Sequence, residues 1–200
     1  MISKAVEDEF NHLVTSQKNF FNDHSENVSM YIKRFVERLD KDIPSLNLTD
    51  LFKFHVEFAA LVHDIGKLAI PLEILSKKKT LTNREYQIIQ NHTQYGTYYL
   101  CNLFKYCKTD EDFDFASVCQ NIVLYHHERN NGSGYLQNLK GDTIPLEAKI
   151  VAIVDSYDAL TSQRCYKQTL TTQEAIQRLL EESSQYDERL LKVFIRSLKE

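Results

Sequence analysis

The sequence contains little glycine and proline, 5 and 3 of its 200 residues. A sandwich or barrel of short strands needs turn-forming residues about every 8–12 positions, so an all-β fold is disfavoured. The same scarcity excludes collagen-like and low-complexity chains, and a hydrophobic content of 42% is enough for a packed core. Because a chain of this length buries a sizeable core without disulfides, we expect a single all-α domain.

Long apolar runs and blocks of one charge are also missing. The longest apolar runs, such as residues 150–154, are far shorter than the roughly 18 residues of a membrane span, and the N-terminal residues do not resemble a signal peptide. The net charge is −4 and the largest block of like charge is the lysine triplet 77–79, which excludes a broad surface for long nucleic acid but not a site for a compact anion. The four cysteines have no CxxC spacing and are expected to stay reduced. We therefore expect a cytoplasmic protein that binds neither membranes nor long nucleic acid.

Apolar residues recur at helical spacing along most of the chain. Residues 1–20 carry a loose pattern of this kind and predict an N-terminal lead-in helix, whereas residues 21–200 show no internal repeat or linker and predict one domain. Capping boxes of the form Thr-x-x-Glu, at Thr82 and Thr171, predict two helix starts. One helix is apolar on nearly every side, which predicts its burial, and Gly66 is expected to end it. The predicted helices cover residues 24–39, 51–64, 82–92, 112–125 and 145–162, then a segment from 171 and a last one around 190–198.

Histidines and aspartates gather at the ends of these predicted helices. An isolated histidine is more often a hydrogen-bonded core or surface residue than a ligand. Here, however, Asp64 ends a very apolar helix and Asp155 ends the apolar run 150–154, where burial of a charge is costly unless a cation compensates. Five of the seven histidines lie near predicted helix ends, namely His24, His63, His92, His126 and His127. This set offers enough ligands for two metal ions bridged by Asp64, an arrangement typical of phosphoester hydrolysis.

Cationic and aromatic residues follow the candidate ligands in the sequence. Lys67 closely follows the first aspartate, and Arg164 and Lys167 follow the last predicted ligand. Most lysines and arginines are only solvated surface charges, but the position of these three predicts contact with a phosphate. The glycine-containing loop 132–135 would bring backbone and the ring of Tyr135 close to a ligand.

Four sequence segments stand in a specific order: HDIGK (63–67), HHERNNGSGY (126–135), LKGDTIPLEAKIVAIVDSYDALTSQRCYK (139–167) and YDERLL (186–191). This series resembles the HD-GYP branch of the HD-domain metal phosphohydrolases, from about residue 24 to the C-terminus. The resemblance implies a helical bundle with a metal site between helices. It also implies hydrolysis of the bacterial second messenger cyclic di-GMP, or of a related cyclic dinucleotide, by a metal-bridging hydroxide, with iron or manganese as the usual metal.

The same resemblance implies a role for each candidate residue. Asp64 and Lys67 would be catalytic, with Asp64 as the bridge between two metal ions. Contacts to the substrate would come from Lys67, Tyr135, Arg164 and Lys167. The complete set of implied metal ligands is His24, His63, Asp64, His92, His126, His127 and Asp155.

Three positions depart from the family pattern. Leu136 stands where the Gly-Tyr-Pro signature has its proline, and Cys165 replaces another proline. Loss of the proline at 136 frees φ, so we expect a less preset loop with an unchanged ligand set. Members that bind a third metal carry a glutamate where this chain has Phe20, so we expect two ions.

Two other functions stay open at this point. Another nucleotide phosphohydrolase could use the same His-Asp pair, although the loop 132–135 argues against it. A non-catalytic module that binds a cyclic dinucleotide or a diguanylate cyclase is compatible with Leu136, although the intact ligand set argues against it. Because members of the family are usually fused to sensory or receiver domains, the input signal could also come from a separate sensory protein.

Overall fold

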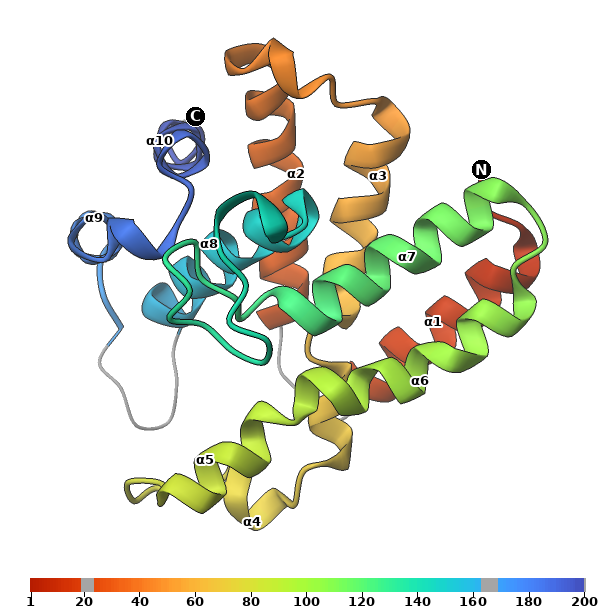
Figure 1. Ribbon diagram of the computed structural model, residues 1–200, viewed down its shortest axis with the longest axis horizontal. Helices are drawn as coiled ribbons and strands as arrows, with labels where there is room; N and C mark the ends of the chain where they lie inside the picture. The colour runs from red at the N-terminus through yellow and green to blue at the C-terminus, as the bar shows by residue number, and fades with distance from the viewer. Residues whose placement is uncertain (19–23, 163–168, 200) are drawn as a thin grey trace.

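The computed structural model describes residues 1–18, 24–162 and 169–199, and over these ranges the chain is all-α, as predicted. In Figure 1 most helices pack into one body, and the short helices α4 and α5 extend from it at the bottom of the view. Within the described ranges, none of the helices combines the length and the apolar character that a membrane span requires. The α-helices are α1 (Lys4–Lys18), α2 (His24–Asp42), α3 (Asp50–Ala59), α4 (Leu72–Leu75), α5 (Asn83–Gln90), α6 (His92–Tyr106), α7 (Asp110–Tyr125), α8 (Leu146–Thr161), α9 (Thr172–Glu181) and α10 (Glu188–Ser197). Short 3-10 helices are η1 (Pro44–Leu46), η2 (Ala60–Val62), η3 (Ile65–Ala69), η4 (Gly141–Thr143) and η5 (Ser183–Gln185).

Threonine caps start several of these helices. The side chains of Thr82 and Thr171 each accept a hydrogen bond from the third backbone N–H of the helix. In return, the backbone N–H of each threonine donates a hydrogen bond to the carboxylate of a glutamate in the first turn, so both predicted capping boxes are confirmed. Thr109 forms a third capping box with Asp112, which places the start of α7 two residues earlier than predicted. Such caps satisfy N–H groups that the first helical turn leaves unpaired.

Two helix predictions are wrong in detail. The helix predicted over residues 51–64 ends at Ala59 and continues as the 3-10 helix η2, and its side chains Phe54 and Phe58 are 37% and 38% exposed. The helix predicted over residues 82–92 breaks at Asn91, so that His92 opens a separate helix, α6. In both places local periodicity continues across a break that depends on tertiary packing, which periodicity does not report.

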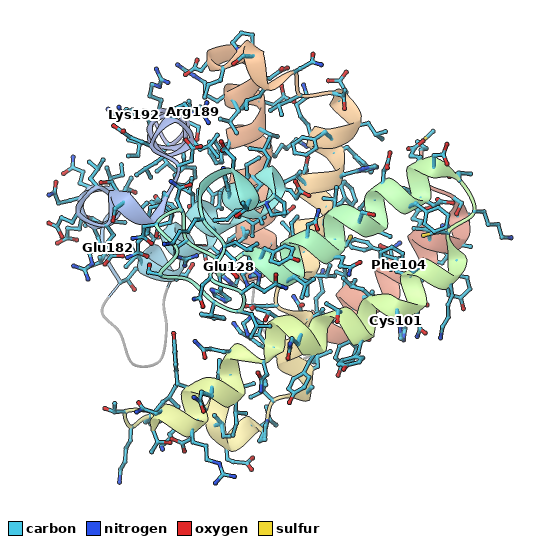
Figure 2. The ribbon with its side chains drawn as sticks, in the orientation of Figure 1. Cys101, Phe104, Glu128, Glu182, Arg189 and Lys192 are labelled. Carbon is cyan, nitrogen blue, oxygen red and sulfur yellow. The ribbon has the colours of Figure 1, made fainter. Side chains whose placement is uncertain are left out.

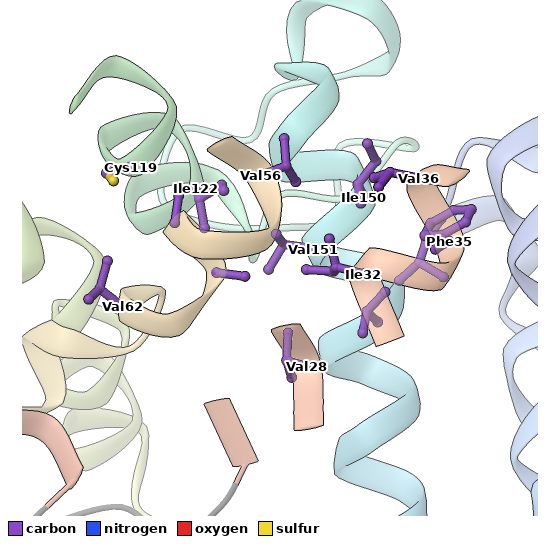
Figure 3. Close-up of a cluster of buried hydrophobic side chains, with 14 of the residues drawn as sticks. Val28, Ile32, Phe35, Val36, Val56, Val62, Cys119, Ile122, Ile150 and Val151 are labelled. Carbon is purple, nitrogen blue, oxygen red and sulfur yellow. The ribbon is translucent and has the colours of Figure 1, made fainter. Parts of the chain in front are cut away.

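The hydrophobic core is centred on α2 and α8, which pack against each other. Helix α2 also contacts α3 and α10, and α8 also contacts α7 and α9. Figure 3 shows side chains of the core meeting from several helices: Val28, Ile32, Phe35 and Val36, then Val56 and Val62, Cys119 and Ile122, and Ile150 and Val151. Helix α1 adds Val6, Phe10 and Leu13 to the same core, so the lead-in helix is packed onto the domain.

Gly66 allows two segments of the chain to approach closely. A Cβ at this position would lie 1.8 Å from the carbonyl oxygen of His92 and 2.4 Å from the backbone nitrogen of Gly96. Gly66 lies within η3, so it does not end the preceding helix as predicted. Its function in the fold is instead to let η3 pack against the start of α6, which brings the segment 63–67 next to His92.

Candidate metal centre

The structure brings the seven predicted metal ligands together from five segments of the chain. Most of them lie at helix ends, where a side chain extends beyond the body of its helix. His24 opens α2, His63 and Asp64 lie between η2 and η3, His92 opens α6, His126 and His127 follow α7, and Asp155 lies within α8. Rings of neighbouring histidines contact one another, with centroids 5.2 Å apart for His63 and His126 and 5.4 Å apart for His92 and His126.

Three of the histidines are held in the same tautomer by a backbone carbonyl of the helix that precedes each of them. Nδ1 of His63, His92 and His126 lies 2.8, 2.7 and 2.8 Å from a carbonyl oxygen three or four residues earlier. A carbonyl oxygen only accepts, so each Nδ1 carries the proton and donates it. In the neutral ring the lone pair is therefore on Nε2, which is the arrangement of a metal-binding histidine with a backbone partner.

These Nε2 atoms converge on the carboxylate of Asp64, which is also an acceptor. Oδ1 of Asp64 lies 3.3 Å from Nε2 of His92 and 3.7 Å from Nε2 of His126, and Oδ2 lies 3.3 Å from Nε2 of His63. Both Nε2 of His63 and Oδ1 of Asp64 are buried, and neither has a hydrogen-bond partner among the residues that the structure describes. Burial of acceptors without donors is unfavourable, and a cation bound among them would remove the penalty. The donor set, imidazole nitrogen and carboxylate oxygen, fits a divalent transition metal.

Two groups of side chains among the described residues have ligand atoms close enough together to hold an ion. One group is Asp64, His92, His126 and His127, and the other is His24, His63 and Asp64. Within each group the ligand atoms lie within 4.8 Å of one another. Because Asp64 belongs to both, the structure is compatible with the predicted bridge. Burial lowers the pKa of His126 to about 4, which keeps this ring neutral and able to bind a metal at neutral pH.

His24 lies on the other side of the cluster, between two carboxylates. Its Nδ1 lies 2.5 Å from Oδ2 of Asp158, and its Nε2 lies 3.1 Å from Oδ1 of Asp155. Burial lowers the pKa of His24, but hydrogen bonds to Asp155 and Asp158 outweigh this effect and raise it to about 9. Asp155 also lies 3.9 Å from Nε2 of His63, which connects it to the candidate ligands. The imidazolium of His24 therefore occupies a place where the protein offers negative charge to a cation.

Lys67 contacts the candidate bridge directly. Its Nζ donates a hydrogen bond to Oδ2 of Asp64, and three quarters of its side chain is buried. Burial would raise the pKa of Asp64, but opposing interactions, the positive charge of the Lys67 ammonium first among them, outweigh it and hold this pKa well below its usual range. The predicted catalytic pair, Asp64 and Lys67, is thus in contact.

Tyr135 covers the cluster from the loop between α7 and α8. Its ring stacks on His127 with centroids 4.7 Å apart and an angle of 25° between the planes, and on the other side it meets the ring of Tyr86 from α5 at 6.4 Å. The aromatic rings of Tyr86, Tyr135 and His127 therefore form a continuous path from an exposed side chain to a candidate metal ligand. The other two predicted phosphate contacts, Arg164 and Lys167, lie outside the described residues, as do Cys165 and Phe20.

Sequence reasoning assigned no role to two residues of this region. Asp158 orients His24, and the sequence signal was its place three residues after Asp155, on the same face of α8. Glu128 is 2% exposed, and both of its oxygens accept hydrogen bonds from the loop that carries Tyr135. Figure 2 labels Glu128 at the start of this loop. Its only sequence signal was a charged residue directly after two predicted ligands.

The model of one protein family, described as the HD domain, matches residues 9–190. The chain belongs to the HD-domain family. The predicted membership of its HD-GYP branch is confirmed, because the family match and the curated relatives agree with the sequence segments that carry the resemblance. The HD pair that gives such domains their name is His63 and Asp64 in this chain, at the centre of the cluster described above.

Relatives of this HD domain carry printed functions. The chain is 33% identical over 178 residues to the cyclic di-GMP phosphodiesterase of Thermotoga maritima, covering 88% of this chain and 44% of that protein. It is 35% identical over 133 residues to the 3'3'-cGAMP-specific phosphodiesterase 2 of Vibrio cholerae, covering 66% of this chain and 24% of that protein. A HDG"Y"P protein from Bdellovibrio bacteriovorus has the same fold, with a TM-score of 0.64 and 16% identity over 98% of this chain and 62% of that one. The chain spans less than half the length of the curated relatives it matches.

Proposed function

We propose that this domain is a metal-dependent phosphodiesterase that opens cyclic di-GMP or a related cyclic dinucleotide. The observation that carries the proposal is the set of buried, converging acceptors around Asp64, two of which have no hydrogen-bond partner within residues 1–18, 24–162 and 169–199. Burial of such a set costs free energy in the metal-free protein, and a bound cation would remove this cost. The sequence segments that resemble HD-GYP proteins, and the names of the relatives, supply the class of substrate.

Asp64, His92, His126 and His127 would hold one ion, and His24, His63, Asp64 and Asp155 a second. Iron or manganese fits these nitrogen and oxygen donors. Divalent ions at such a site supply the Lewis acidity that activates a water molecule and offsets the negative charge developing on the phosphoryl oxygens. Binding of a metal by His24 requires loss of its Nε2 proton, which is now directed at Asp155.

The remaining residues act on the substrate. Lys67 lies against Asp64 and places an ammonium where a phosphoryl oxygen would meet the metal site. Arg164 and Lys167 add positive charge on the same chain segment that follows Asp155, and the fork of Arg164 suits two phosphate oxygens. Tyr135 presents its ring beside His127, where it would offer an aromatic surface to a base of the substrate.

This activity fits a cytoplasmic protein in bacterial signalling. The substrate class is a second messenger, so a diguanylate cyclase that makes it, or a separate sensory protein, is a natural partner. The proposal concerns the domain described here.

Turnover of cyclic di-GMP by the metal-loaded chain tests the proposal. We expect a linear dinucleotide or mononucleotide product to appear in parallel with loss of the cyclic substrate, with 3'3'-cGAMP as the competing substrate under identical conditions. A bis(p-nitrophenyl) phosphate control separates general phosphodiesterase chemistry from recognition of the cyclic dinucleotide. Tight binding of cyclic di-GMP without any hydrolysis by fully metal-loaded protein would contradict the proposal and favour a non-catalytic binding module.

A further inference from the structure

Glu128 is a buried carboxylate that serves the backbone of a loop. It directly follows His126 and His127, and only 2% of its surface is exposed. One oxygen accepts a hydrogen bond from the N–H of Gln137 at 2.6 Å, and the other accepts one from the N–H of Leu139 at 3.0 Å. The side chain therefore joins the end of α7 to a segment nine to eleven residues further along the chain. Hydrogen bonds to an ionised acceptor are stronger than those between neutral groups.

The segment that Glu128 holds includes Tyr135. Gly134 packs so closely on the residue that a Cβ there would lie 2.5 Å from the Cα of Glu128. The N–H of Tyr135 donates a hydrogen bond to the carbonyl of His127 at 3.2 Å, and Nδ2 of Asn138 donates one to the carbonyl of Gly134. Tyr135 is therefore held on both sides. Before it, Gly134 packs against Glu128 just after the end of α7, and after it, Gln137 and Leu139 donate hydrogen bonds to the Glu128 carboxylate.

We propose that Glu128 is a positioning residue, whose buried carboxylate holds the loop 134–139 in the shape that stacks Tyr135 on His127. The loop of this chain depends on such an anchor, because Leu136 stands at the proline position of the Gly-Tyr-Pro signature and leaves the backbone angle φ unrestricted next to Tyr135. The consequence for substrate rests on the proposed function, since it assumes that Tyr135 contacts the bound dinucleotide. The consequence for the loop does not.

The test is Glu128→Gln, which keeps the size and shape of the side chain but turns one acceptor oxygen into an NH2 group that faces a backbone N–H. The matched control is Gln137→Ala, which removes an exposed side chain and leaves its backbone N–H in place. Hydrogen exchange of the metal-loaded chain, read in peptides of the loop 134–141 and of the core helices α2 and α8, gives the direct measurement. In Glu128→Gln we expect exchange in the loop to become about tenfold faster or more. Exchange in α2 and α8, and the metal content, should stay unchanged, and Gln137→Ala should match the wild type throughout.

Kinetics with cyclic di-GMP give the second measurement. We expect KM to rise about tenfold in Glu128→Gln, with kcat changed less than about threefold, because a misplaced Tyr135 weakens binding while the metal site stays intact. Unchanged loop exchange would overturn the proposal. So would faster exchange spread equally over loop and core, which would show a role in the stability of the whole domain. If neither protein hydrolyses the substrate, the proposed function fails, and the exchange data still decide the role of Glu128.

Discussion

Asp64 and Asp112 are both buried carboxylates, 4% and 0% exposed, yet their surroundings are opposite in kind. Asp112, at the start of α7, accepts hydrogen bonds from the backbone N–H groups of Ser3, Lys108 and Thr109 at 2.7–3.1 Å. Asp64, at the centre of the histidine cluster, faces the lone pairs of imidazole nitrogens, and no group in the described part of the chain donates a hydrogen bond to its Oδ1. Both oxygens of Asp112 have donors within the fold, whereas among the described residues Asp64 has a donor on Oδ2 alone, from Lys67.

The difference indicates that the charge of Asp112 stabilises the fold, whereas that of Asp64 belongs to the proposed metal site. Burial would raise the pKa of Asp112, but the N–H groups of Ser3, Lys108 and Thr109 outweigh this effect and hold that pKa well below its usual range. Asp112 therefore stabilises the fold by joining the N-terminal segment, α7 and the turn before it. The negative charge of Asp64 is compensated only in part by Lys67, which is consistent with the metal-binding role proposed above.

The largest expected effect is that of Asp64→Ala. Removal of the carboxylate shared by both candidate metal groups should abolish metal loading and bring cyclic di-GMP turnover below detection, because two cations would then repel each other without a bridge. Asp112→Asn, with metal and turnover retained, is the control.

A smaller effect is expected for Asp158→Asn. The amide keeps one acceptor for Nδ1 of His24 but loses the charge that orients and polarises the ring. Loss of such a partner typically lowers metal affinity by about 10–100-fold, so titration with Mn²⁺ should show weaker binding at one of two sites. Equal affinity in wild type and Asp158→Asn would remove Asp158 from the metal centre.

Asp112→Asn should lower the free energy of unfolding at pH 7 by roughly 1–3 kcal/mol, the range for hydrogen bonds to a charged acceptor. The pH dependence has a definite sign. Because the pKa of Asp112 is lower in the folded than in the unfolded protein, its contribution is fully present above the unfolded pKa of about 3.9 and is lost as the pH falls toward the folded pKa. The difference between wild type and variant in urea unfolding should therefore shrink below about pH 4. A constant difference from pH 7 to pH 3 would contradict this assignment.

The smallest expected effect is that of Leu136→Pro, which touches neither carboxylate. Proline at this position should restrict the backbone of the loop. The effect on the free energy of the competent loop conformation is about 0.4–1 kcal/mol, equivalent to a few-fold change in the population of that conformation. We expect turnover with saturating metal to change a few-fold at most, in either direction. Hydrolysis that appears only in Leu136→Pro would show that the loop, and not the acceptor cluster, limits the function.

Local sequence signals predicted much of this fold, because they depend on neighbouring residues. The capping boxes at Thr82 and Thr171 need only residues three apart, and both form. The break at Asn91 and the end of α3 at Ala59 were not predictable in this way, since the apolar periodicity of the sequence continues across both positions. Exposure of Phe54 and Phe58 depends likewise on which helices cover α3, and apolar character alone does not indicate that.

The candidate site shows the same division. The cluster of five histidines and two aspartates was predictable as a set, because polar residues next to apolar helix ends imply a compensating cation. The tautomers, the contact of Lys67 with Asp64 and the roles of Asp158 and Glu128 depend on distances between segments. For Asp112 the sequence indicated only a nearby helix start, because a backbone donor as distant along the chain as Ser3 leaves no mark in the sequence.

Metal stoichiometry measured side by side in wild type, Asp64→Ala and Asp112→Asn tests the central claim most directly. The chains are purified without chelator, reconstituted anaerobically with Fe²⁺ or Mn²⁺, and freed of unbound ion before elemental analysis. We predict about two ions per chain in wild type and in Asp112→Asn, and none in Asp64→Ala. Wild-type protein that takes up no metal, or Asp64→Ala that binds as much as the wild type, would contradict the claim that the unpaired acceptors around Asp64 form a metal centre.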